Sequence, residues 1–300
     1  MKLILIDTPG ASKAAVAGLQ EVFSHTQRLH KRDELEPIRL ITVTADALPT
    51  TRADAVILPP AFGNDQYLNP SETVLDWLRK QDDSCIMASA CAGAFYLGAA
   101  GLLKGRRVTT HWALEQSLRD RLPNTDVDTD EILITDGRLI TAGGLLSWVD
   151  LALELIAQLS SVEIMREVGR HFVVDTGRRE QRYYRAFTPV LNHGDGAIEQ
   201  AQILIERTYT ARISISQLAQ TVALTERTFL RRFERATDLT PLAYVQHLRI
   251  EAAQRALENT TAAIDQIAYA VGYENANAFR KLFKRHTGLS PSAYRQRLKR

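Results

Sequence analysis

The sequence predicts an α/β N-terminal domain, with a mostly parallel sheet and helices on both faces, followed by an all-α C-terminal domain with two helix-turn-helix units. Three observations carry this prediction. Short apolar runs alternate with helical patterns over the first 160 residues, and a block near residue 233 recurs fifty residues later. The charge also changes sign: residues 195–300 hold 16 Lys and Arg against 10 Asp and Glu, whereas residues 1–194 hold 21 against 25. Two modules with different partners are therefore expected.

Composition limits the class of protein before any motif is considered. The 300 residues are 45% apolar and 24% charged, which is typical of a globular chain with two or three cores. No apolar run reaches the roughly eighteen residues of a membrane span, and the apolar run at Leu3–Ile6 is too short for the core of a signal peptide. The two cysteines, Cys85 and Cys91, do not suggest a disulfide framework. The expected location is the cytoplasm, with no metal or cofactor.

In the N-terminal part, apolar runs predict buried strands with helices between them. Strands are expected at Leu3–Ile6, Ile38–Val43, Ala55–Leu58 and Ser84–Ala88, and helices at Ser12–Phe23 and Ser71–Arg79. Strands that are apolar on both faces indicate a parallel sheet covered by helices on each side. Such sheets bind ligands at the carboxyl ends of their strands.

Cys91 lies at such an end, directly after the expected fourth strand. Its neighbours Ala90, Ala92 and Gly93 are small, as the tight strand-turn-helix of a nucleophile elbow requires. A helix N-terminus at this point would lower the pKa of the thiol and offer N–H groups to an anion. The competing interpretation is that Cys91 is a small apolar packing residue.

The segments Ser89–Phe95 and Ala100–Trp112, which include Cys91 and His111, resemble the PfpI-like (class I glutamine amidotransferase-like) domain. More narrowly, they resemble its version at the front of AraC-type transcription regulators, over roughly residues 1–165. The resemblance implies the site of the enzymes of that superfamily, in which the cysteine is the nucleophile, a nearby histidine assists, and an acidic residue from the first helix region completes the site.

Two departures from the enzymes argue against catalysis. Ala15 stands where related hydratases carry the acidic residue, and the loop after the third strand reads Pro59-Pro60-Ala61-Phe62-Gly63-Asn64. Proline offers no N–H to an oxyanion, and Phe62 would fill space that a substrate needs. Cys91 and His111 are therefore expected to be vestigial, with no catalytic residue. An effector pocket is predicted instead, lined by Cys91, Ala92, Gly93, His111, Phe62 and Asn64.

The C-terminal part repeats a helix-turn-helix pattern. Leu218-Ala219 precedes Ala223, and Ile267-Ala268 precedes Gly272, so that in each copy an alanine allows two helices to approach and a small residue permits the turn. Thr240-Pro241 and Ser290-Pro291 then predict capped helix starts. Between the copies, one face of a linker helix is expected to carry Tyr244, Leu248, Ala252 and Ala256. Over about a hundred residues, this region resembles the AraC/XylS DNA-binding domain.

Each copy predicts one recognition helix. The first begins after Thr225 and the second near Asn275, with Phe229, Phe233, Phe279 and Phe283 facing the interior. Arginine can pair with guanine and asparagine with adenine. For any one of these arginines, a contact to a phosphate without sequence preference is an equally favoured interpretation. The predicted DNA-binding set is Glu226, Arg227, Thr228, Leu230, Arg231, Asn275, Ala276, Asn277, Arg280 and Lys281.

The expected domains are 1–165 for the sensor or dimerisation domain, 166–196 for a connector and 197–300 for the DNA-binding domain. The leading hypothesis is a sequence-specific transcription regulator. Its expected partners are an operator in double-stranded DNA, a small effector, a second copy of the chain bound through the N-terminal domain, and RNA polymerase. One alternative is a cysteine hydrolase or hydratase of a small amide or nitrile-like substrate with a DNA-binding appendage. Another is a front domain that only dimerises.

Overall fold

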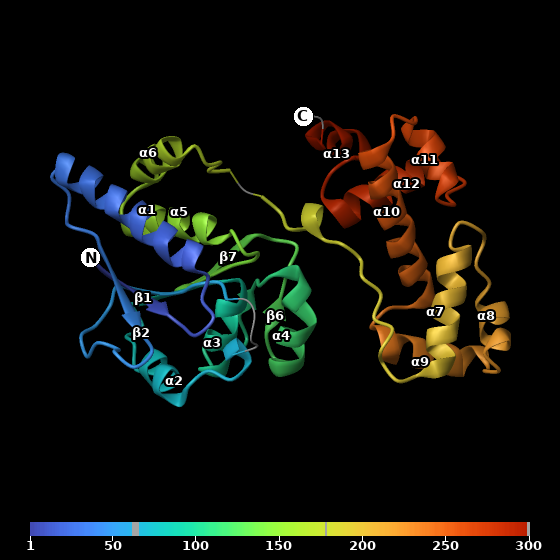
Figure 1. The fold of residues 1–300 in the computed structure, drawn as a ribbon, viewed down its shortest axis with the longest axis horizontal. Helices are drawn as coiled ribbons and strands as arrows, with labels where there is room; N and C mark the ends of the chain where they lie inside the picture. Colours follow the sequence, from blue (N-terminus) through green and yellow to red (C-terminus); the bar gives the residue numbers. More distant parts are fainter. Residues whose placement is uncertain (62–65, 178, 299–300) are drawn as a thin grey trace. The chain divides into compact units, whose positions relative to one another are not determined.

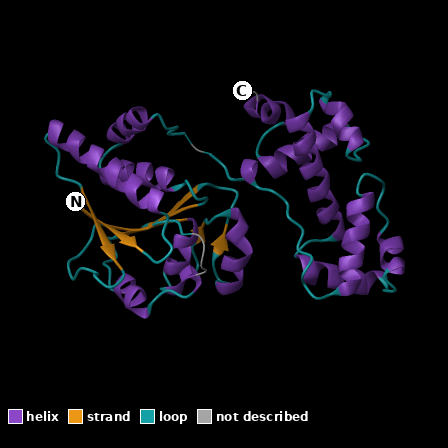
Figure 2. Ribbon diagram, viewed as in Figure 1, coloured by secondary structure: helices purple, strands orange, loops and turns teal. Residues whose placement is uncertain are grey.

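The computed structural model describes residues 1–61, 66–177 and 179–298, and the chain divides into two compact units, Met1–Gln181 and Arg182–Arg300 (Figure 1). The first unit combines strands and helices, and the second is built from helices (Figure 2). The expected boundary after residue 165 falls inside α6 (Val162–Phe172), because Ile164 and Val168 of this helix pack into the core of the first unit. Within the described residues, no helix is both long and apolar enough to cross a membrane.

A six-stranded sheet forms the centre of the first unit. Its order is β2-β1-β3-β4-β8-β7, with every pairing parallel except that of β7 with β8. The prediction of a mostly parallel sheet is thus confirmed. The strands are β1 (Lys2–Asp7), β2 (Arg39–Thr44), β3 (Ala55–Leu58), β4 (Ile86–Ala90), β7 (Leu133–Asp136) and β8 (Leu139–Ala142), and a separate parallel pair is formed by β5 (Arg107–Val108) and β6 (Asp126–Val127).

Helices cover both faces of this sheet because the central strands are apolar on both sides. The residues of β3 and β8 are all buried, so each face needs a cover. The core on one face includes α1 (Lys13–Arg32), α5 (Trp148–Leu159) and α6, and the core on the other includes α2 (Glu72–Arg79), α3 (Ala94–Ala99) and α4 (Glu115–Arg121) (Figure 1). Short 3-10 turns occur at Gln66–Leu68, Cys91–Gly93 and Trp112–Leu114.

Helix α1 runs nine residues beyond its predicted end at Phe23. The continuation contains two polar residues, Thr26 and His30, that are buried with their hydrogen bonds made. The Thr26 hydroxyl donates to the carbonyl of Val22 at 2.9 Å, and the His30 ring lies 2.7 Å from the carbonyl of Glu36 and 2.8 Å from the Ser160 hydroxyl. Burial of satisfied polar groups hides the helical period from a hydropathy reading.

The second unit has two cores, joined by one long helix. The helices are α7 (Gly196–Thr208), α8 (Ile215–Thr221), α9 (Glu226–Thr237), α10 (Pro241–Asn259), α11 (Ile264–Ala270), α12 (Ala276–Thr287) and α13 (Pro291–Leu298), with a 3-10 turn at Arg182–Tyr184. Tyr244 and Leu248 of α10 pack into the first core, and Ala252 and Ala256 into the second. The predicted face of the linker helix therefore serves both units, as expected.

Candidate functional site

The turn after β4 has the strained geometry of an elbow. Cys91 has a φ of 52°, in the left-handed region that side chains rarely occupy. Position 93 has room only for glycine, because a Cβ there would lie 2.5 Å from the carbonyl oxygen of Leu58. The left-handed φ of Cys91 and the lack of space at Gly93 explain why this tight strand-turn-helix needs small residues.

The Cys91 thiol is not activated by this geometry. The residue is 3% exposed and packs with Ala61 and Ala92, against Tyr67 and Leu114. Burial raises the pKa of the Cys91 thiol to about 11, and the N–H of Ala92 lowers it only in part. The expectation that a helix N-terminus lowers this pKa is therefore wrong. Removal of the sulfur from water outweighs the local dipole.

The predicted partner, His111, is engaged in local structure. Its Nδ1 accepts the N–H of Ala113 at 3.0 Å, which caps the 3-10 turn Trp112–Leu114, and burial lowers the pKa of its ring. Among the described residues, no hydrogen bond joins the His111 ring to the Cys91 sulfur. The preceding residue makes the link instead: the Thr110 hydroxyl donates to the carbonyl of Cys91 at 2.8 Å.

The remaining parts of a catalytic site have other roles. Ala15 is fully buried in α1, and the Pro60 carbonyl accepts the N–H of Ser12 at 2.8 Å, so at Pro60 the loop after β3 presents an acceptor. Phe62 and Asn64, which complete the predicted pocket, lie outside the described residues. Ala92 and Gly93 lie beside Cys91 in the elbow.

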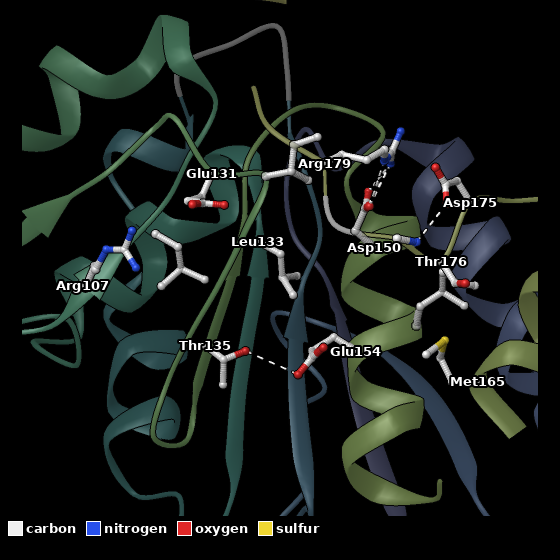
Figure 3. Close-up of a pocket in the computed structure, with 14 residues that line it drawn as sticks. Arg107, Glu131, Leu133, Thr135, Asp150, Glu154, Met165, Asp175, Thr176 and Arg179 are labelled. Atoms are coloured by element: carbon white, nitrogen blue, oxygen red, sulfur yellow. Dashed lines mark hydrogen bonds and ion pairs between the residues drawn. The ribbon is translucent and has the colours of Figure 1, made fainter. Parts of the chain in front are cut away.

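A polar cavity of about 300 Å³ lies elsewhere in the first unit (Figure 3). Its wall includes β7, α5, α6 and the segment that follows α6. The Arg179 guanidinium and the Asp150 carboxylate form an ion pair there at 2.6 Å. The sequence gives no signal for this cavity, because its lining comes from separate segments. The lining residues are Arg107, Glu131, Ile132, Leu133, Ile134, Thr135, Asp150, Leu153, Glu154, Met165, Asp175, Thr176, Gly177 and Arg179.

The second unit holds two helix-turn-helix pairs, α8 with α9 and α11 with α12. The Thr225 hydroxyl accepts the N–H of Thr228 to cap α9, and the Asn275 carboxamide accepts the N–H groups of Asn277 and Ala278 to cap α12. The four predicted interior aromatic residues, Phe229, Phe233, Phe279 and Phe283, are fully buried. The predicted starts and the predicted apolar faces of both recognition helices are therefore confirmed, and the Asn275 cap is a finding of the structure.

Most of the predicted DNA-binding side chains lie on the outer face of these helices. Those that are exposed are Glu226, Arg227, Leu230, Arg231, Asn277 and Lys281, together with Asn275, whose side chain caps α12. Thr228 is half-buried, and its hydroxyl accepts that of Thr225. Ala276 packs partly against the second core. The Arg280 guanidinium pairs with Asp265 of α11 and donates to Asn277, and the DNA-binding role of both residues stays a prediction.

The internal repeat extends further than the sequence comparison indicates. The Tyr244 hydroxyl donates to Glu206 at 3.3 Å and accepts from Gln202, and the Tyr294 hydroxyl donates to Glu258 at 2.8 Å and accepts from Gln254. Helix α10 is thus the closing helix of the first pair and the opening helix of the second. The Gln-x-x-x-Glu spacing at Gln202 and Gln254 is the signal that could have revealed it.

Comparisons with known proteins agree with this two-unit description. Residues 30–158 match the DJ-1/PfpI family, and residues 218–297 match a helix-turn-helix domain. The HTH-type transcriptional regulator CdhR of Pseudomonas aeruginosa is 28% identical over 81% of this chain and 72% of its own length. The HTH-type transcriptional regulator GlxA of Rhizobium meliloti is 28% identical over 69% of this chain and 64% of its own.

A third similarity is confined to the first unit. The isonitrile hydratase of Pseudomonas putida is 36% identical, over 37% of this chain and 47% of its own length. The similarity to CdhR and GlxA, by contrast, spans more than two thirds of this chain. The chain thus combines a DJ-1/PfpI domain in its N-terminal part with an AraC-type helix-turn-helix domain in its C-terminal part.

Proposed function

We propose that this protein is a sequence-specific DNA-binding transcription regulator, whose first unit binds a small effector, assembles a dimer, or both. One observation carries the DNA-binding part: two capped recognition helices are mounted on a single helix, α10, each with polar and basic side chains outward. CdhR and GlxA, whose similarity spans both units, are named transcriptional regulators. Such a regulator acts where the DNA is, in the cytoplasm, and RNA polymerase is a further proposed partner.

Both readers are proposed to contact one face of the DNA. Two recognition helices held by one rigid helix suit successive major-groove segments, which are roughly 34 Å apart. Each chain would therefore cover a two-part site, and a dimer would cover two such sites. Footprinting measures this directly, and protection of a single groove segment per chain would contradict it.

Arg231 and Lys281 occupy equivalent positions, two residues before Phe233 and Phe283. Both are exposed, and within the described residues neither forms an ion pair, in contrast to Arg280. We expect Arg231→Ala to lose about 1–3 kcal/mol of operator binding and to relax preference at one position, because arginine can pair bidentately with guanine. If Lys281 contacts a phosphate, Lys281→Ala should weaken all sequences alike and reduce the salt slope by about one.

Affinity measured over a series of salt concentrations, on operator variants obtained by selection from random duplexes, distinguishes the two roles. Arg207→Ala is the matched control, since it removes an exposed arginine on α7, outside the recognition helices. If Arg231→Ala and Arg207→Ala weaken binding equally on every sequence, Arg231 does not read bases.

We propose that the first unit, Met1–Gln181, senses and assembles without catalysing a reaction. A buried thiol with a pKa of about 11, a histidine used as a cap, and Ala15 in place of an acid all support this. In addition to the pocket predicted at the elbow, we propose the polar cavity at Asp150 and Arg179 as a second candidate effector pocket. Melting of residues 1–181 against small metabolites would identify a ligand, since a hundredfold excess over Kd stabilises by about 2.7 kcal/mol.

Cys91→Ser is expected to leave operator affinity unchanged and to remove no turnover. The thiol is a packing residue 3% exposed, and serine of nearly equal size keeps the elbow. The measurement is operator binding together with assays for amide and nitrile-like hydrolysis or hydration. Activity of the native chain that Cys91→Ser abolishes would reinstate the enzyme hypothesis.

A further inference from the structure

Gln181, the last residue of the first unit, is a buried amide with every polar atom engaged. It is 3% exposed, and its Nε2 donates to the carbonyl oxygens of Thr110 and Glu131, each at 2.9 Å, and lies 3.0 Å from the Thr109 hydroxyl. Its Oε1 accepts the N–H of Trp112 at 3.2 Å, and its own N–H donates to the carbonyl of Asp130. Acceptors facing the amino group and a donor facing the oxygen match a primary carboxamide.

Space for this carboxamide depends on Gly143. A Cβ at that position would lie 1.9 Å from the Gln181 Nε2 and 2.5 Å from the carbonyl oxygen of Thr110. Gly143 does not have a positive φ, so backbone freedom is not the reason for a glycine there. The pocket is thus built around the amide.

Gln181 is connected both to the Cys91 elbow and to the start of the second unit. Thr110, whose carbonyl accepts from Gln181, donates its hydroxyl to the carbonyl of Cys91 in the elbow. One peptide bond after Gln181, the 3-10 turn Arg182–Tyr184 belongs to the second unit. There the Tyr183 ring lies 5.0 Å from that of Tyr294, and the Arg297 guanidinium lies over it at 4.3 Å.

We propose that Thr109, Thr110, Trp112, Glu131 and Gly143 form a primary-carboxamide site that Gln181 fills in cis, and that its occupancy steadies the Cys91 elbow through the Thr110 hydroxyl, which donates to the carbonyl of Cys91. A small primary amide competes for the same groups, whereas a carboxylate brings negative oxygens against two carbonyl oxygens. The site stands independently of the proposed function. A regulatory role, in which a bound amide displaces Gln181 and so frees the end of the first unit, rests on the proposed function.

The alkylation rate of Cys91 by N-ethylmaleimide in the full chain, followed by mass spectrometry, tests the site. We expect Gln181→Ala and Gln181→Glu to raise the rate about tenfold or more. The alanine removes the three buried hydrogen bonds of the carboxamide, and the glutamate replaces its amino group by an oxygen that faces the carbonyl oxygens of Thr110 and Glu131. Gln116→Glu is the matched control, since Gln116 is exposed and bonds only to Asp120 among the described residues. Cys85, which is fully buried, reports any global unfolding.

Chemical rescue separates an amide site from a merely structural glutamine. Acetamide should slow alkylation of Gln181→Ala back toward the native rate, and sodium acetate at equal concentration should not. Gly143→Ala should also speed alkylation, but without rescue, because the added methyl group fills the pocket. An unchanged rate in Gln181→Ala, or equal rescue by acetate, would overturn the proposal.

A random-sequence duplex added to the native chain tests the link to the second unit. If DNA binding to the second unit shifts the turn at residues 182–184, it must also change the alkylation rate of Cys91, because linked equilibria are reciprocal. Gln181→Ala must abolish that change. Duplex binding without any change in the rate refutes the link while the proposed function stands. Failure of selection from random duplexes to yield any bound sequence refutes the proposed function, and the acetamide result still decides the site.

Discussion

Phe283→Ala is expected to unfold the second helix-turn-helix pair and to shorten the footprint to one groove segment per chain. The ring is fully buried and packs against Phe279 at 5.6 Å and Tyr294 at 5.4 Å between centroids. Truncation of a buried phenylalanine to alanine costs about 3–5 kcal/mol. The second core is small, so a loss of this size should melt α11 and α12 locally.

Hydrogen exchange of residues 264–287 measures the local loss, and footprinting measures its consequence for DNA. Phe233→Ala is the counterpart in the first pair, where the equivalent ring is also fully buried. It should remove protection of the other groove segment. Gln296→Ala, an exposed change in α13, should leave both segments protected. Two protected segments in Phe283→Ala, with α12 exchanging rapidly, would show that the second reader does not contact DNA.

The second large effect is expected at the turn of the second pair. Gly272 has a φ of 95°, and a Cβ there would lie 2.4 Å from the carbonyl oxygen of Thr210. We expect Gly272→Ala to destabilise the second unit by about 2–4 kcal/mol, because left-handed strain adds to displacement of the Thr210 backbone. Denaturant unfolding of the full chain, followed with a probe in the second unit, measures this cost.

Ala223 occupies the equivalent position in the first pair, with a φ of 55°. Ala223→Gly therefore provides the reverse test. We expect it to be neutral or to stabilise by up to about 1 kcal/mol, since relief of left-handed strain exceeds the extra entropy of an unfolded glycine. Destabilisation by Ala223→Gly would show that the Ala223 methyl group packs usefully and that the strain argument does not hold for this turn.

Local chemistry allowed the sequence to determine much of this protein. Apolar runs predicted four of the parallel strands, β1 to β4, and missed β8. In β1, β3 and β4, burial on both faces leaves no polar alternation. Thr240-Pro241 determined the start of α10, and Phe229 and Phe233 determined the inward face of α9, since capping and the 3.6-residue period act within a few residues. The repeat of these features determined two readers and hence the DNA-binding class.

Only the tertiary structure decided what many individual side chains can do. The thiol pKa of Cys91 depends on Ala61, Tyr67 and Leu114, which are distant in sequence but together exclude water from the sulfur. Whether Arg280 is available for DNA depends on Asp265, fifteen residues away on another helix. The polar cavity and the Gln181 site combine segments from residues 107 to 181. Burial and charge pairing arise from such long-range contacts, and a local sequence pattern carries no record of them.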